Sequence, residues 1–496
     1  MFRTQLDPSL PSNHPINALS PLRKHLILYT LAYAGLLANF GVAILQCAFV
    51  PMGKAFGVSP GDIPNSIGYQ LLGFAVGPLL WAPLAQTIGR RPVYLIGAFL
   101  YMPCCVWMAL SNSYAVFCVA RTVAGIVSSW SQVVPPASVA DIFVKEVRGS
   151  KMSVYSTCVV IAPAVAPVFS GLIINSYSWR VQFWLVLALA GLQFILFFFI
   201  VPETLWVADA AATPPTSADR KPKAIERTAS DLKPIGDEEQ IEMSPGPLEH
   251  SQASRRVGSA WMPWTRPREY FALVAAPIAM ARFLPVLLPS IYYGSLFAWS
   301  VGITIVMPQK FEEPPYNFAT IPLGCAFLAF GIGGVLGKWS GGIVGDLVVS
   351  RFERKKGQRQ PEHRLWALLP LLPFMFVGCA IVGVTIEKEL HWIAYLIGGG
   401  LFFFCLSAAT GILQTYVLES YLPRAQDTQA VFIFFKSIWG FVIPQFVTEW
   451  GESDGYLAEY LAQGALATGV GAVLCGGLIW KGYELRRAQR MPVVEK

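Results

Sequence analysis

The chain has 496 residues, of which 54% are hydrophobic and only 14% are charged. A soluble domain carries about 25% charged residues because its surface faces water, so this composition excludes an ordinary soluble domain and favours a protein that lies in lipid. The net charge of +7 does not indicate nucleic-acid binding, because the basic residues gather in loops between apolar stretches. In lipid the backbone must pair its own polar groups, so we expect every span to be a helix.

The N-terminal part of the chain predicts a tail and then six membrane spans. Residues 1–25 are polar and proline-rich, and we interpret them as a cytoplasmic tail without a removable signal peptide. A spanning helix needs about 20 apolar residues. Such stretches follow at Ile27–Val50, Ile63–Ile88, Pro92–Ser111, Tyr114–Ala140, Met152–Tyr177 and Val181–Val201. They predict an N-terminal six-helix bundle over residues 26–202.

Residues 203–270 interrupt the apolar pattern. Their many prolines and charges are typical of a disordered linker, here on the cytoplasmic side. Phe271–Met280 is apolar but too short to span, so we expect it to lie at the membrane interface. Six more spans are predicted at Phe283–Gln309, Phe318–Gly345, Leu365–Ile386, Trp392–Leu418, Thr428–Val447 and Tyr460–Trp480. We assign 271–481 to a C-terminal six-helix bundle and 482–496 to a cytoplasmic tail.

The sequence thus predicts an all-α integral membrane protein, with twelve transmembrane helices in two pseudo-symmetric six-helix bundles around a central cavity. When the N-terminus is placed inside, the outer loops hold only Lys54, Arg180, Lys310 and Lys388 of the 37 basic residues. Cytoplasmic loops of membrane proteins are enriched in lysine and arginine, so both termini are expected in the cytoplasm.

Charged residues at the inner ends of the spans predict a gate. The loop after the second span reads Ala82-Pro-Leu-Ala-Gln-Thr-Ile-Gly89-Arg90-Arg91-Pro92. Arginines there are able to pair with carboxylates at neighbouring helix ends and so latch the inner mouth. The expected members of this gate are Arg90, Arg91, Asp141, Arg148, Glu203 and Asp346. The alternative is ordinary anchoring by positive charge, with the carboxylates as solvated loop charges.

This loop resembles the signature loop of the major facilitator superfamily, and most of all its fungal drug:proton antiporters with twelve spans. Further segments resemble motifs of that family in order, namely Arg121-Thr-Val-Ala-Gly125, Ala140-Asp141, Arg148-Gly149, Ala162-Pro163-Ala-Val-Ala166-Pro167-Val-Phe-Ser170-Gly171, Ser178-Trp179-Arg180, Pro202-Glu203-Thr204, Pro361-Glu362-His363-Arg364-Leu365 and Thr415-Tyr416-Val-Leu-Glu419. The resemblance covers nearly all of residues 26–480. The chain departs from the family at Gln86, where an acid is usual, so the latch cannot use a carboxylate at that position.

The resemblance implies a secondary transporter and not an enzyme. It implies proton-coupled efflux of a small organic molecule, such as a drug or secondary metabolite, by alternating access. It implies a monomer in the plasma membrane, with the vacuolar membrane as the alternative. Pro163, Pro167 and Gly171 then form the packing residues of the antiporter motif. We expect no cofactor, metal or nucleic acid, since no histidine lies deep in a span and no convincing nucleotide loop is present.

Polar and aromatic residues within the spans are candidates for the substrate cavity. A charge inside a span is costly and usually faces a cavity or a partner, which singles out Arg121. Lys436 shares a helical face with Phe432, Phe435 and Trp439. The predicted lining is Asn39, Gln46, Gln70, Arg121, Gln132, Tyr292, Trp299, Gln414, Lys436 and Trp439. The alternatives are snorkelling for the basic residues and hydrogen bonds between helices for the amides.

Two further patterns concern packing and substrate charge. Gly333, Gly337, Gly341 and Gly345 recur at a spacing of four, which predicts a close helix–helix contact. We find no aspartate or glutamate deep in any predicted span, and a carrier of cations would benefit from one, so a neutral or anionic substrate is favoured.

The same absence leaves proton coupling open. A protonatable substrate would serve, or a carboxylate at the mouth such as Asp62, Glu312 or Glu313. The alternatives are a uniporter or a proton-coupled carrier of an organic acid, and a transporter-like sensor. The identity of the substrate and the direction of transport do not follow from the sequence.

Overall fold

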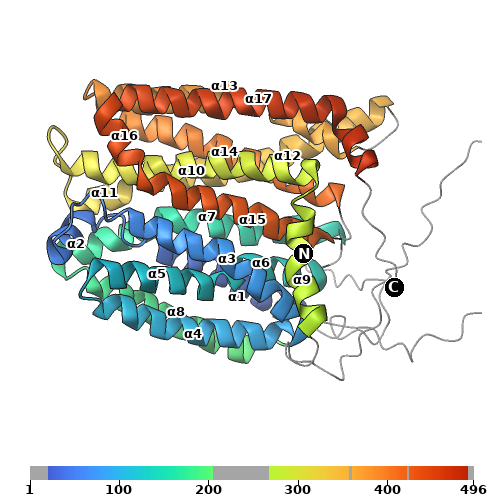
Figure 1. Ribbon diagram of the computed structural model, residues 1–496, viewed down its shortest axis with the longest axis horizontal. Coiled ribbons are helices and arrows are strands. Elements are labelled where there is room, and N and C mark those ends of the chain that lie inside the picture. The colour runs from blue at the N-terminus through green and yellow to red at the C-terminus, as the bar shows by residue number, and fades with distance from the viewer. Residues whose placement is uncertain (1–19, 144, 205–266, 357–359, 422–423, 490–496) are drawn as a thin grey trace, which may run out of the picture.

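The computed structural model describes residues 20–143, 145–204, 267–356, 360–421 and 424–489. Within these ranges, ten helices are long and apolar enough to cross a membrane, or twelve when each of two bent helix pairs counts as one span. The long helices run side by side along one axis of the molecule (Figure 1). The predicted linker, 203–270, falls largely outside the described residues.

The N-terminal half consists of α1 to α8. Their bounds are α1 (Pro21–Ala43), α2 (Phe49–Phe56), α3 (Asn65–Thr87), α4 (Arg90–Leu110), α5 (Tyr114–Ser128), α6 (Trp130–Ile142), α7 (Lys145–Ser176) and α8 (Arg180–Ile200). The side chain of Ser20 accepts a hydrogen bond from the Arg23 amide, which caps α1, and Pro21 suits the first helical position. α5 and α6 form one span with a break at Ser129, whose hydroxyl donates to the Ile126 carbonyl at 2.8 Å.

The C-terminal half consists of α9 to α17 with two short 3₁₀ helices. Their bounds are α9 (Pro267–Met280), α10 (Leu284–Glu312), α11 (Thr320–Ala326), α12 (Leu328–Lys356), η3 (Pro361–Ala367), α13 (Leu371–Glu387), α14 (Trp392–Ser420), α15 (Ala425–Val442), η5 (Ile443–Gln445), α16 (Val447–Asp454) and α17 (Tyr456–Ala488). Each predicted span coincides with one of these helices or helix pairs. α1 and α17 extend into the predicted tails, because a helix continues past its apolar part where polar residues meet water.

The two halves repeat one packing pattern. In the N-terminal half α1 packs on α7, α3 on α5 and α4 on α8. In the C-terminal half the helices at equivalent places in the chain make the same pairs, α10 with α15, α12 with α14 and α13 with α17. Such repetition is the organisation of transporters built from two related bundles.

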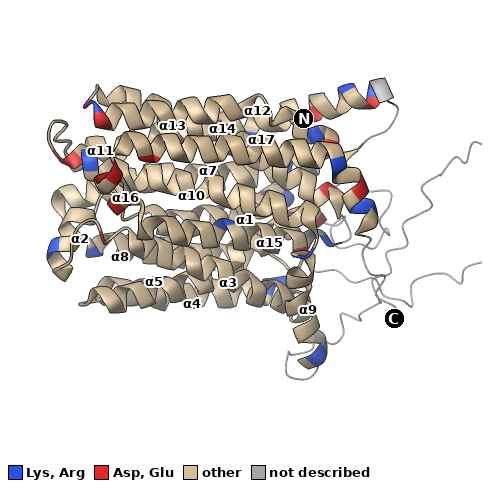
Figure 2. Cartoon of the chain, turned by 45° about the horizontal axis from the view of Figure 1, so that its top comes forward, with Lys and Arg blue, Asp and Glu red and all other residues tan. Residues whose placement is uncertain are grey.

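The largest contacts between the halves involve α3 and α7 of the N-terminal half. α3 packs along α15, and α7 packs against α11 and α12. Figure 1 shows these helices where the blue-green half meets the yellow-red half. We call the end that holds the start of α1 and the end of α17 the linker end, and the other the opposite end. Charged residues gather at both ends (Figure 2).

The buried apolar residues show where the halves are fused. Ile44 and Ile67 of the N-terminal half share one large cluster with Ile303 and Ile443 of the C-terminal half, all near the opposite end. At the linker end, apolar residues of the N-terminal half such as Trp81 form a separate cluster. The continuous apolar core therefore joins the halves at the opposite end.

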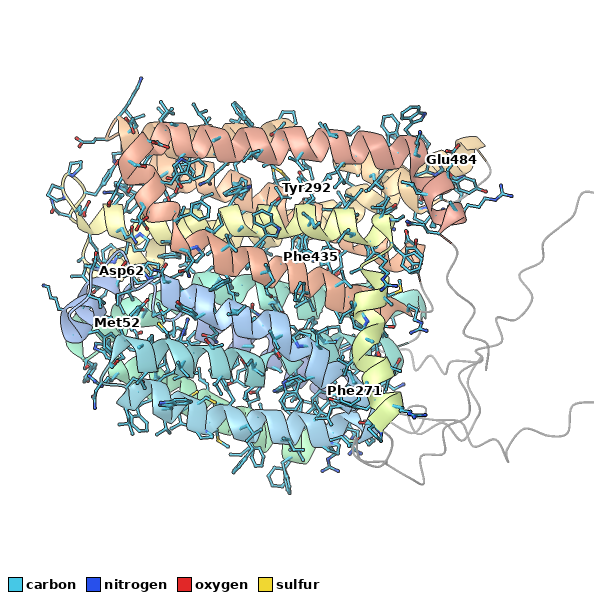
Figure 3. The ribbon with its side chains drawn as sticks, in the orientation of Figure 1. Met52, Asp62, Phe271, Tyr292, Phe435 and Glu484 are labelled. Carbon is cyan, nitrogen blue, oxygen red and sulfur yellow. The ribbon has the colours of Figure 1, made fainter. Side chains whose placement is uncertain are left out.

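α9 crosses the linker end nearly at right angles to the spans (Figure 1). It packs on both α3 and α15, and the Tyr270 hydroxyl lies 3.5 Å from the Leu80 carbonyl. Its exposed apolar side chains include Phe271, at the end of α9 in Figure 3, and Ile278. This arrangement fits the interfacial segment predicted at Phe271–Met280, and the helix begins four residues earlier, at Pro267.

Candidate functional site

A charged cluster holds the start of α4 at the linker end. An Arg90 guanidinium nitrogen lies 2.5 Å from an Asp141 carboxylate oxygen and another donates to the Ser138 hydroxyl at 3.3 Å. The Glu203 carboxylate accepts the backbone N–H groups of Arg90 at 3.1 Å and Arg91 at 3.0 Å. Gly89 precedes α4 with φ of 100° and offers no side-chain cap, so Glu203 caps this helix from a distant part of the chain.

A corresponding cluster lies in the C-terminal half. The Arg364 guanidinium, at the start of the span η3–α13, binds Asp346 at 2.8 Å and Glu419 at 3.0 Å. Arg486 at the end of α17 binds Glu362 at 3.1 Å. Arg90 and Arg364 occupy equivalent places in the two halves, as do Asp141 and Glu419. The same arrangement of an arginine and a carboxylate therefore occurs once in each half.

The structure divides the predicted inner gate between these clusters. Arg90, Asp141 and Glu203 meet as expected, and Arg91 donates to the Phe198 carbonyl at 3.0 Å. Asp346 belongs to the other half and binds Arg364 there, not Arg90 or Arg91. The side chain of Arg148 lies outside what the structure describes. The sequence analysis missed Arg364 and Glu419, although both stand in segments that resemble family motifs.

Arg121 is fully buried within the N-terminal half. Its guanidinium donates to the carbonyls of Gly41 at 2.9 Å, Val42 at 3.0 Å and Ser66 at 3.3 Å. Gly41 and Val42 form the end of α1, and Ser66 lies in the first turn of α3. In this conformation Arg121 therefore ties α5 to two helix ends, whereas the sequence analysis expected it to line the substrate cavity.

The predicted amides of the N-terminal half are buried and incompletely paired. Asn39 donates to the Gly35 carbonyl of its own helix at 2.7 Å. Both polar atoms of the Gln70 side chain, the carbonyl oxygen of Gln46 and the amide nitrogen of Gln132 are buried without a hydrogen-bond partner among the described residues. Unpaired buried amides are uncommon, because each one lacks the hydrogen bonds it makes in water.

Two predicted cavity residues face the interior of the C-terminal half instead. The Tyr292 hydroxyl donates to the Ala467 carbonyl at 2.8 Å, so this ring lies between α10 and α17 (Figure 3). The Gln414 amide donates to Gln429 of α15 at 3.0 Å. Trp299 is buried two turns beyond Tyr292 on α10, and its indole N–H has no partner among the described residues. Tyr292 and Trp299 are seven residues apart and share a face of α10, but this spacing does not identify the neighbour that the face meets.

Lys436 and its aromatic neighbours lie where the halves meet. The Lys436 ammonium lies 4.6 Å from the centre of the Phe297 ring. One turn along α15, a Cβ on Gly440 would lie 2.8 Å from Leu71 of α3 and 3.0 Å from Phe297, so this face of α15 is in contact with the N-terminal half. Trp439 packs on Gly294 of α10. Lys436 forms no ion pair with a described residue, unlike the arginines of the two clusters.

The antiporter-motif segment forms the other contact between the halves. A Cβ on Gly171 of α7 would lie 2.2 Å from the Thr320 carbonyl, and one on Gly324 of α11 would lie 2.4 Å from the Pro167 carbonyl. Glycine is thus required on both helices for the backbones to approach. The glycine stripe of α12 contacts α14, with Gly333 against Gly400 and Gly337 against Phe404, which confirms its predicted role in packing.

The start of the last span differs from the prediction and brings Glu459 into the helix. α17 begins at Tyr456, four residues before the predicted start, so Glu459 lies inside this spanning helix and is fully buried. Glu459 is the fourth residue of α17, so it is a buried acid at the end of a span and not deep within one. The hydropathy pattern missed Glu459 because the charge itself, together with Glu449, Glu452 and Asp454 just before it, moved the predicted start of the span toward the C-terminus.

The family model of the Major Facilitator Superfamily matches residues 31–444, the larger part of the chain. The chain belongs to the major facilitator superfamily. This confirms the family predicted from the motifs, and places the protein among multi-pass membrane transporters, which are not enzymes. In this chain, the cluster around Arg90 lies in the N-terminal bundle and the cluster around Arg364 in the C-terminal bundle.

The chain is similar to several fungal proteins that are named as transporters or resistance proteins. The chain is 22% identical over 481 residues to the MFS antiporter QDR3 of Candida albicans, covering 80% of this chain and 69% of that protein. It is 25% identical to the MFS-type transporter penM of Penicillium rubens, with 88% and 80% covered. It is 22% identical to quinidine resistance protein 3 of Saccharomyces cerevisiae, with 81% and 74% covered. These relatives agree with the fungal antiporter branch that the motifs indicated.

Solved structures of other superfamily members share the fold. A partially occluded inward-open conformation of the xylose transporter XylE from E. coli matches with a TM-score of 0.60 at 16% identity, covering 93% of this chain and 98% of that one. An inward-facing bacterial homologue of the lysosomal transporter Spinster matches with a TM-score of 0.59 at 13% identity, covering 96% and 100%. The predicted all-α fold with two six-helix bundles is confirmed.

Proposed function

We propose that this protein is a proton-coupled exporter of small organic molecules that works by alternating access. The linker end faces the cytoplasm, with both termini there, and the protein acts as a monomer in the plasma membrane. In this proposal residues 26–202 and 271–481 are the two bundles that rock against each other, and 203–270 is their cytoplasmic linker. The names of the fungal relatives support export of drugs or metabolites.

The observation that supports alternating access most directly is the contrast between the two ends. At the opposite end the halves share an apolar core and touch through Gly171 and Gly324. At the linker end each half has its own charged cluster, and a side-chain bond between Gln86 and Gln426, 3.1 Å long, links the halves. Contacts that differ in strength at the two ends allow one end to open while the other stays closed.

A second candidate is carriage of organic acids, and Lys436 is the observation that favours it. A lysine at the contact between the halves, beside Phe297 and Trp439 and without an ion-pair partner among the described residues, is suited to bind an aromatic anion. Gln70 adds unpaired amide groups in the N-terminal half. These groups also suit neutral polar molecules, in agreement with the substrate classes favoured by the sequence.

Transport into proteoliposomes with an imposed pH gradient tests the proposal. The probes are uncharged, anionic and cationic aromatic compounds, with quinidine among the cations. We expect accumulation that requires the gradient and collapses with a protonophore. In Lys436→Gln, accumulation of anionic compounds should fall at least about tenfold, the effect of losing roughly 1.4 kcal/mol of interaction. The matched control is Lys481→Gln, because Lys481 also contacts an aromatic ring, Trp480, but at the exposed end of α17.

Each outcome decides a different part of the proposal. Accumulation of some probe without any effect of the gradient would identify a uniporter. Equal activity of Lys436→Gln toward anions would remove Lys436 from the substrate site. Absence of transport for every class of probe, by protein that is folded and inserted, would contradict the proposed function.

A further inference from the structure

The feature that the transport site leaves unexplained is the carboxylate of Glu459. One of its oxygens accepts a hydrogen bond from the Gln463 amide at 2.7 Å. The other is buried without a hydrogen-bond partner, and Glu459 forms no ion pair with a described residue. Glu459 and Gln463 are both fully buried.

Among the described residues, no cation forms an ion pair with Glu459. On its own helix it is flanked by Tyr456 and Tyr460, whose hydroxyls are also unpaired among the described residues, and Tyr395 of α14 donates to the Ile303 carbonyl. The nearby charges on α16 and at the end of α13 are all exposed, namely the acids Glu449, Glu452, Asp454 and Glu387 and the cation Lys388. Lys310 of α10 lies 5.2 Å from the centre of the Tyr456 ring, but its ammonium binds Glu313 at 3.1 Å.

An ionised carboxylate in this position would be desolvated and uncompensated, which is among the costliest states of a buried group. The N-terminus of α17 favours the anion only weakly by comparison. The protonated acid avoids this cost. Its carbonyl oxygen still accepts the hydrogen bond from the Gln463 amide. When the site is closed, Glu459 is therefore more stable with a proton bound.

α16 connects this site to the contact between the halves. On one side, a Cβ on Gly451 of α16 would lie 2.6 Å from the unpaired Glu459 oxygen. On the other side, Thr448 of α16 lies against Gly61 of the N-terminal half, 3.7 Å from a Cβ built there. Separation of the halves at the opposite end would move α16 away from one or both neighbours and admit water to Glu459.

We propose that Glu459 is a proton-binding site that couples the pH at the opposite end to opening of that end. With the proton bound, α16 stays packed on α17 and the end stays closed. Opening hydrates the carboxylate, and the proton leaves to water. Acid pH therefore favours the closed end and alkaline pH the open end. Proton binding by Glu459 is inferred from the geometry alone. The role of this proton in transport rests on the proposed function.

Two measurements on the full-length protein test the site. The first is infrared difference spectroscopy, where the wild type should show the carbonyl stretching band of a protonated carboxylic acid at neutral pH, absent from Glu459→Gln. The second is the distance between spin labels at Ser59 and Ser453, exposed positions on the two halves at the opposite end, in a background without native cysteines. It should lengthen as the pH rises, and stay short at all pH values in Glu459→Gln.

Two more variants keep the test decisive. Glu452→Gln removes an exposed acid of α16 and should leave the pH response unchanged. Gln463→Leu removes the amide that stabilises the anion, so the midpoint of the response should move to higher pH, by about one unit. A band that survives in Glu459→Gln, or a pH response unchanged in both Glu459→Gln and Gln463→Leu, would overturn the proposal. Neither result depends on whether a transported substrate has been found.

Discussion

At the scale of single residues, Arg121 shows how a membrane protein accommodates a buried charge without a carboxylate. Its three hydrogen bonds all go to carbonyl oxygens, two of them at the end of α1. The carbonyls at a helix end have no partner within the helix, and a guanidinium supplies several donors in a fixed geometry. The side chain thus satisfies both its own charge and the backbone of two other helices.

We predict that Arg121→Ala destabilises the protein markedly. Each hydrogen bond to a charged group contributes about 1.5–3 kcal/mol, and the substitution leaves three carbonyls without this donor. The melting temperature in detergent should fall by several degrees. The matched control is Arg180→Ala, which also removes three hydrogen bonds, to Ala109, Ser111 and Asn112, but at a partly exposed site where water replaces them. Equal losses in both variants would show that burial of Arg121 does not matter.

The sequence predicted which side chains are unusual, but not the groups that they meet. It singled out Arg121 as a buried charge, and this was correct. Its partners on α1 and α3 lie 55 to 80 residues away in the chain, beyond the reach of any local pattern. For the same reason the sequence did not show that Asp346 binds Arg364 or that Tyr292 binds the Ala467 carbonyl. Local patterns define a face, and only the packing of distant helices decides what it touches.

At the scale of helices, glycine sets how closely the halves approach at the opposite end. Gly171 on α7 and Gly324 on α11 each lie against a backbone carbonyl of the other helix. A Cβ at either position would be too close to that carbonyl oxygen. The prolines Pro163 and Pro167 lie on the same segment of α7. Because a proline lacks the N–H group, it frees a carbonyl one turn earlier and permits the bend that brings such surfaces together.

We predict that Gly171→Ala opens the opposite end. The added methyl group would lie 2.2 Å from the Thr320 carbonyl, so α7 and α11 must separate. Overpacking of this kind costs about 1–3 kcal/mol. If the cost falls on the closed state, the open state gains about 5- to 150-fold in population. Spin labels at the exposed positions Ser178 and Ala319 should report a longer distance.

Gly191→Ala on α8 is the control for this prediction, since nothing lies within 4 Å of a Cβ at that position. It should leave the distance and the melting temperature unchanged. An unaltered distance in Gly171→Ala would mean that the contact between α7 and α11 does not hold the opposite end closed.

At the scale of the whole molecule, the sequence was most informative, because the apolar stretches report lipid contact directly. The order of the spans and the division into halves were predictable from the stretch lengths and the polar segment between them. The start of α17 was not, since the buried Glu459 and the exposed acids of α16 before it lower the local hydropathy. The equivalence of Arg90 and Arg364 was hidden as well, because the two arginines are preceded by loops of different length.

The contact between Gln86 and Gln426 gives the last prediction, at the linker end. Both side chains are neutral, and their hydrogen bond joins α3 to α15 across the two halves. A neutral hydrogen bond contributes about 0.5–1.5 kcal/mol. Gln86→Ala should therefore raise the population of states open at the linker end by about two- to tenfold, and lengthen the distance between labels at Ser150 and Ser350, exposed positions near the ends of α7 and α12.

The control for Gln86→Ala is Gln426→Ala, which removes the other partner of the same bond. If the bond acts as a latch, each single variant and the double variant should lengthen the label distance to the same extent, because the interaction is lost once in all three. Additive effects would mean that the two glutamines act independently, through other neighbours. A distance unchanged in every variant would leave closure of the linker end to α9 and α6, described helices that pack on both α3 and α15.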